Sequence, residues 1–247
     1  MTLPEMRPRI SIQPLDGVSF SVDFREDPWY FTVLETGEKT QWAIYDPPDW
    51  RRTVVSNMEV KGKAVVHGEE ALEIQVDAYE NGSWRENSAR HYTQLGDQFI
   101  KYLAVLSYQH GIPHLDTFLD ENFHENWGQR TPRLWRDEGR FQVGEENHFV
   151  TVDPQKAGGM GYFAVTIGEK TFPCLRVLDT AAAGQEGVLV EAYLSEAGRT
   201  VLFRRYNSEA WRPKSGWVKA AKDNQRIGLD GVTYVHWYDC ISDYGMK

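Results

Sequence analysis

Apolar and polar residues alternate with a period of two over several stretches, a pattern that predicts β-strands. The clearest stretch is 72–78, where every second side chain is apolar. Asn81-Gly82 follows it and favours a two-residue hairpin turn, because both residues tolerate a positive φ. We therefore expect a hairpin with one apolar face. The turn predicts three facing pairs: Glu80 with Ser83, Tyr79 with Trp84, and Glu73 with Arg90.

Further hairpins are predicted by the same reasoning. Residues 188–207 alternate around a turn at Gly198, and residues 226–241 turn at Asp230-Gly231. Another hairpin is expected around 137–139. The return strand after Gly231 places three candidate ligand-binding residues on one side: Tyr234, His236 and Tyr238.

One helix is expected near 113–127, because Pro113 suits a helix start and apolar residues then recur at helical spacing. A shorter helix is expected at 217–222. These elements together predict a mainly β (α+β) fold. It would be a curved antiparallel sheet or a sandwich built from two similar meanders, with one helix near 113–127.

The tetrapeptide GEKT occurs at 37–40 and at 168–171. A phosphate-binding loop needs adjacent Gly and Lys residues and a second glycine five positions before the first. In both copies Glu separates Gly from Lys, and the earlier position holds Thr32 or Phe163, so neither copy fits the motif. The strings at 67–77 and 167–179 are alike, and Gly68 and Gly168 are 100 residues apart. We expect one β-rich unit over 1–247 with pseudo-repeat halves at about 18–128 and 129–247, in which each Gly-Glu turn starts a strand.

The segments GRTVLFRRYN (198–207) and VHWYDCISDY (235–244) resemble an uncharacterised family of bacterial β-rich proteins. The resemblance implies no activity and no site residues. A curved sheet of two repeats is also similar to lipoprotein-carrier-like half-barrels, a likeness of fold alone.

Composition narrows the possible functions. The net charge of −9 disfavours binding to a nucleic-acid backbone, and Lys and Arg cluster only in pairs. The N-terminus lacks the apolar stretch of a signal peptide, and no apolar run is long enough for a membrane span. Two cysteines are too few for a disulfide framework, so a cytoplasmic location is expected. No cofactor motif is present, and no cofactor is predicted.

Potential metal ligands are densest near the predicted helix: His110, His114, Asp120 and His124. His110 and His114 are four residues apart, although Pro113 between them argues against an intact helical turn. The solvated face of a helix is the alternative interpretation. Cys240 and His236 lie about 13 Å apart along a strand, so they cannot form a nucleophile–base pair directly.

Nine tryptophans are many for 247 residues, and an aromatic-lined sheet face suits an apolar or sugar-like ligand. We predict a non-enzymatic cytoplasmic protein that binds a small ligand or a protein partner, with Trp84 among its ligand-binding residues. The alternative is a metal-dependent or acid–base enzyme centred on 110–125.

Overall fold

The computed structural model describes residues 3–18, 20, 22–23, 35–84, 88–95, 100–109, 111–117, 129–130, 141–143, 149–152, 161–179, 188–197, 199–207, 226–227, 233–234 and 236–246. These residues form β-strands almost throughout, which confirms the mainly β fold. The one helical element among them is the 3-10 helix η6 (Tyr244–Met246).

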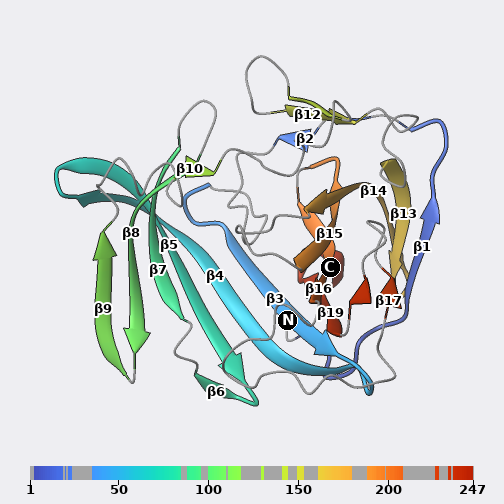
Figure 1. The fold of residues 1–247 in the computed structure, drawn as a ribbon, viewed down its shortest axis with the longest axis horizontal. Coiled ribbons are helices and arrows are strands. Elements are labelled where there is room, and N and C mark those ends of the chain that lie inside the picture. The colour runs from blue at the N-terminus through green and yellow to red at the C-terminus, as the bar shows by residue number, and fades with distance from the viewer. Residues whose placement is uncertain are drawn as a thin grey trace.

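A single strongly curved, open antiparallel sheet of 14 strands organises the molecule (Figure 1). Its neighbours follow the order β1 (Ile10–Pro14), β13 (Gly161–Ile167), β14 (Lys170–Asp179), β15 (Val188–Ser195), β16 (Thr200–Asn207), β19 (His236–Ser242), β3 (Lys39–Asp46), β4 (Arg51–Val66), β5 (Glu69–Glu80), β7 (Ala89–Leu95), β8 (Ile100–Gln109) and β10 (Gln129–Arg130). Two short strands extend it: β6 (Ser83–Trp84) beside β5 and β9 (Ile112–Thr117) beside β8.

Two smaller sheets accompany the large one. The first has the order β11 (Phe141–Val143), β12 (Phe149–Val152) and β2 (Val22–Asp23). The second pairs β17 (Arg226–Ile227) with β18 (Thr233–Tyr234), so the two sides of the hairpin expected over 226–241 pair at these residues, while its turn at Asp230-Gly231 lies outside the described residues. The rest of the expected return strand is β19, which pairs with β16 and β3 instead. The strand at 141–143 pairs with β12, and residues 131–140 of the hairpin expected around 137–139 lie outside the described residues.

The hairpin at Asn81-Gly82 is confirmed. Both turn residues have positive φ, 49° and 82°, and the pairs Glu80–Ser83 and Tyr79–Trp84 form as expected. The third pair is wrong, because Arg90 lies opposite Gln75 while Glu73 lies opposite Tyr92. The pairing of β5 with β7 is shifted by two residues relative to its pairing with β6. A single turn residue pair therefore fixes the register only over the first residues of the return strand.

The helix expected near 113–127 is wrong in its first turn, because residues 112–117 form β9. All six residues of β9 pair with β8, from Ile112 opposite Gln109 to Thr117 opposite Ala104. Pro113 sits on an edge strand, where its missing N–H costs no ladder hydrogen bond. Residues 118–128 and the helix expected at 217–222 lie outside the described residues.

Gly-Glu turns do start strands. Gly68 (φ 85°) lies in the turn between β4 and β5, and Gly168 (φ 62°) in the turn between β13 and β14. Gly68 is the second residue of its two-residue turn, whereas Gly168 is the first, so the two hairpins differ by one residue in register. Lys39 and Lys170 are the exposed first residues of β3 and β14.

The half of the sheet from β1 to β3 curls around its own core, with the N-terminal strap (residues 3–9) across its open side (Figure 1). The strap leads into β1, which pairs with β13, while its Glu5 and Arg7 backbones bond Arg52 and Trp50 at the start of β4. The strap thus links the two edges of this half, which we call the closed half.

The core of the closed half is apolar at one end of the strands, where η6 covers it. Its buried members include Val165, Ile167, Val201 and Ile241, and Tyr244 packs against it. In the other half of the sheet, the buried face carries a second cluster around Ile74. Opposite that cluster lies a half-buried to exposed face of β5 to β9, which we call the open face.

Candidate functional site

Charged residues occupy core positions on the inner face of the closed half. Residues that lie opposite each other on antiparallel strands point to the same side of the sheet. One such row runs from Glu191 on β15 through Arg204 on β16 to Asp239 on β19. The next row of the same face, from Tyr193 through Leu202 to Ile241, belongs to the apolar core. The charged residues therefore occupy the row next to the apolar core on the same face.

Asp239 is the centre of a buried ion-pair network. Its side chain is 0% exposed and accepts a 2.6 Å hydrogen bond from Nε of Arg204. Arg7, from the N-terminal strap, donates to the other carboxylate oxygen of Asp239. Burial lowers the pKa of Arg204, but attraction and hydrogen bonding to Asp239 outweigh it and raise the pKa overall. The Arg204 guanidinium is therefore positively charged.

Aromatic rings lie beside Arg7 and Arg204, at the end of the closed half that we call the mouth. Trp50 and Trp237 meet edge to face at 4.7 Å, and Tyr206 stacks on Trp237 at 6.1 Å between ring centroids. The guanidinium of Arg7 lies 3.4 Å from the ring centroid of Trp50. Cations over indole faces are stabilised by the ring quadrupole. Arg7 therefore joins the aromatic rings to the ion-pair network, because it contacts both Trp50 and Asp239.

A second polar group adjoins the network on β14 and β15. The Tyr193 hydroxyl donates to Glu191 at 3.3 Å, and both residues are buried. Burial, and next the charge of Glu191, raise the pKa of Tyr193 to about 12, while Arg176 opposes this through its charge and a side-chain hydrogen bond. The hydroxyl therefore stays protonated as a donor at neutral pH.

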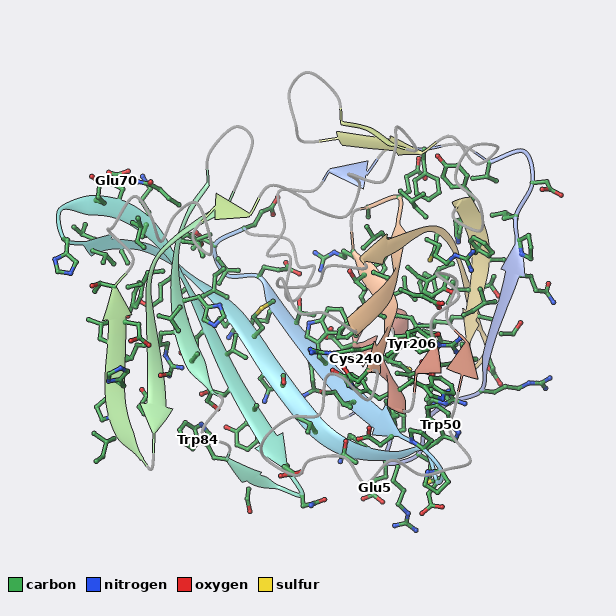
Figure 2. All side chains as sticks on the ribbon, viewed as in Figure 1. Glu5, Trp50, Glu70, Trp84, Tyr206 and Cys240 are labelled. Carbon is green, nitrogen blue, oxygen red and sulfur yellow. The ribbon has the colours of Figure 1, made fainter. Side chains whose placement is uncertain are left out.

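Trp84 lies on the open face, away from the mouth (Figure 2). It is 41% exposed, meets Tyr108 edge to face at 5.2 Å, and its indole Nε1 donates to Asp77 at 3.4 Å. Arg90 pairs with the same carboxylate at 3.5 Å. This is a second aromatic surface, separated from the mouth by β3, β4 and β5.

The structure describes the other predicted ligand-binding residues only in part. Tyr234 lies on β18 and His236 begins β19, and their side chains are outside the described residues. Tyr238 follows on β19, and burial raises the pKa of its hydroxyl. Its neighbours Asp239 and Trp237, rather than Tyr238 itself, point to the inner face.

The predicted metal ligands are only partly described. His114 on β9 lies 3.0 Å from Asp116, and both side chains are about half exposed. Among the described residues, no cluster of three or more His, Cys, Asp or Glu side chains could hold a metal ion. His110, Asp120 and His124 lie outside those residues, so their metal site stays a prediction.

Sequence reasoning missed the ion-pair network. Asp239 and Arg204 belong to the strings VHWYDCISDY and GRTVLFRRYN, and an alternating strand pattern places each of them among apolar neighbours on one face. A charge at a core position of a strand was the available signal. The contribution of Arg7 had no such signal, because it depends on a contact 232 residues away in the chain.

Comparison of the chain with protein-family models, curated proteins and solved structures finds no match. Within the described residues, no helix is long and apolar enough to span a membrane. The site must therefore be interpreted from its own chemistry.

Proposed function

We propose that this protein is a non-enzymatic binding protein that holds a small aromatic or apolar ligand at the mouth of the closed half. The inner face there presents Trp50, Trp237 and Tyr206 at the end of the core opposite η6. Large aromatic side chains with a few fixed polar groups are typical of the linings of small-molecule sites. The open ends of curved β-structures are common places for such sites.

The observation that carries the proposal is the burial of the ion-pair network. Replacing a buried ion pair by apolar residues of similar volume is often neutral or stabilising, because removing the charges from water is costly. Stability alone therefore gives little reason to place Asp239, Arg204 and Glu191 at core positions. Recognition of a polar group on a bound molecule gives a reason.

A neutral fluorescent probe, N-phenyl-1-naphthylamine, tests the proposal. We expect saturable binding of one probe per chain, with energy transfer from tryptophan to the probe. Trp237→Phe should weaken binding, because it shortens the ring system that Tyr206 and Trp50 pack against. Trp84→Phe on the open face is the matched control and should bind the probe like the unaltered chain.

Absence of saturable binding would refute the proposal. Equal loss in both variants would also contradict it, because the two tryptophans lie in different halves of the sheet. Thermal denaturation of each variant separates a lost site from a lost fold.

We also propose a cytoplasmic location and a duplicated origin for the sheet. Cys174 and Cys240 are free and buried on opposite faces of the sheet, as a reducing compartment allows. The meander β4–β5–β7–β8 and the meander β13–β14–β15–β16 each follow their chain order in the sheet, which supports duplication.

A further inference from the structure

Arg176 is a charged side chain whose hydrogen-bonding capacity is not filled. It lies on β14 in the same inner-face row as Tyr193 on β15. Its guanidinium carbon is 4.0 Å from the ring centroid of Phe163. Its Nε is buried and has no hydrogen-bond partner among the described residues. A buried donor without a partner carries its full desolvation cost, so the described residues leave this donor in need of an acceptor.

One of the two cross-strand neighbours of Arg176 is a glycine. Gly161 lies directly opposite Arg176 on β13 and contributes no side chain there. Gly161 has a φ of 134°, a conformation that side-chain-bearing residues rarely adopt. The sequence therefore keeps a glycine beside a guanidinium whose Nε lacks an acceptor.

Positive charge exceeds negative charge among the described groups of the mouth. The rows of the inner face carry the guanidinium groups of Arg52, Arg176 and Arg204, and the strap adds Arg7. Among the residues that the structure describes, two carboxylates face them, those of Asp239 and Glu191. Asp239 is already shared by Arg7 and Arg204, and Glu191 accepts from Tyr193. The cluster is therefore short of an anion.

We propose that the ligand of the mouth carries an oxyanion, a carboxylate or a phosphate, bound by Arg176 with Tyr193 beside it. This deepens the proposed function and rests on it. A planar guanidinium matches such groups with two parallel hydrogen bonds, and Nε is one of the donors of that fork. The aromatic body of the ligand packs against Trp237 and Trp50. On the inner face, the row of Trp237 lies on the other side of the Glu191–Arg204–Asp239 row from Arg176, so the ligand spans that row.

Three probes share one ring system and differ in charge: 2-naphthoate, 2-naphthyl phosphate and neutral 2-naphthamide. Comparing their affinities separates the contribution of the charge from that of the apolar ring system. Calorimetric titration should give the two anions at least about tenfold lower Kd than the amide, the size expected for a charged hydrogen bond. Arg176→Gln should abolish that difference and leave binding of the amide unchanged. Arg90→Gln, which alters a half-buried arginine on the open face, is the matched control and should retain the difference.

Equal affinities of the anions and the amide would overturn this inference and leave the proposed function standing. An unchanged ratio in Arg176→Gln would also overturn it. Failure of all three probes to bind would refute the inference and the proposed function together. If Arg176→Gln does not fold, Arg176→Lys takes its place, because it keeps the charge but removes Nε and the planar fork. A ratio of anion to amide affinity that Arg176→Lys leaves unchanged contradicts the inference.

Discussion

Asp239 should be the most sensitive charged position in the chain. Asp239→Asn keeps the size of the side chain but removes the negative charge between Arg204 and Arg7. The carboxylate is 0% exposed, and Arg204 is only 12% exposed, so water cannot replace the lost partner. Removing one partner of a buried ion pair typically costs about 3–5 kcal/mol. Two cations lose their shared anion here, so we expect a loss in that range.

Urea denaturation at equilibrium measures the loss, with tryptophan fluorescence as the signal. Asp77→Asn is the matched control, because Asp77 also pairs with an arginine and also lies on a strand. Its carboxylate is 22% exposed, so the control should cost about 1 kcal/mol or less. The double variant Asp239→Asn with Arg204→Gln should lose less than the sum of its parts, by about 0.5–3 kcal/mol.

Equal losses in Asp239→Asn and Asp77→Asn would refute the reasoning, because burial would then make no difference. Strict additivity in the double variant would show that Asp239 and Arg204 do not interact as the 2.6 Å hydrogen bond requires.

Three further predictions follow from the core. Gly245→Ala should destabilise the fold by about 1–3 kcal/mol in the same urea assay, since its new Cβ would lie 2.8 Å from a carbonyl oxygen of β16; no loss would mean that η6 moves freely. Tyr45 and Tyr193 should titrate, by absorbance at 295 nm, only near their raised pKa of about 12. Because the unfolded chain loses these protons near 10.0, stability should be unaffected by them below that pH and fall as the pH rises towards 12. Burial raises the pKa of the Cys174 and Cys240 thiols, so neither should react with a disulfide reagent until the chain is unfolded; rapid reaction in the native state would contradict their burial.

Local patterns in the sequence were sufficient to predict most of the fold. Alternation in 72–78 and the Asn81-Gly82 turn predicted a strand, its buried face and the first two cross-strand pairs. These features depend on neighbouring residues, which the sequence displays directly. The error at Arg90 arose because register beyond the turn depends on how the return strand is built, and no residue pattern states this.

The β9 strand and the mouth show where local reasoning stops. Leu115 fits a helical stripe, yet β9 pairs with β8, because tertiary pairing overrides a short amphipathic pattern. The pairing of Trp84 with Tyr79 follows from the turn, whereas a ligand-binding role for Trp84 stays a prediction. Arg7 and Asp239 come into contact only through the tertiary fold, because they are 232 residues apart in the chain. Their contact therefore could not be predicted from residue spacing.

The measurement that tests the central claim most directly is the response of the indole N–H signals to 2-naphthoate in a proton–nitrogen NMR titration. Trp→Phe variants assign the signals of Trp50, Trp237 and Trp84. If the ligand binds at the mouth, the signals of Trp50 and Trp237 shift and saturate with one Kd, while that of Trp84 stays in place. A saturating shift of Trp84 alone, or no shift of any of the three, would contradict the account.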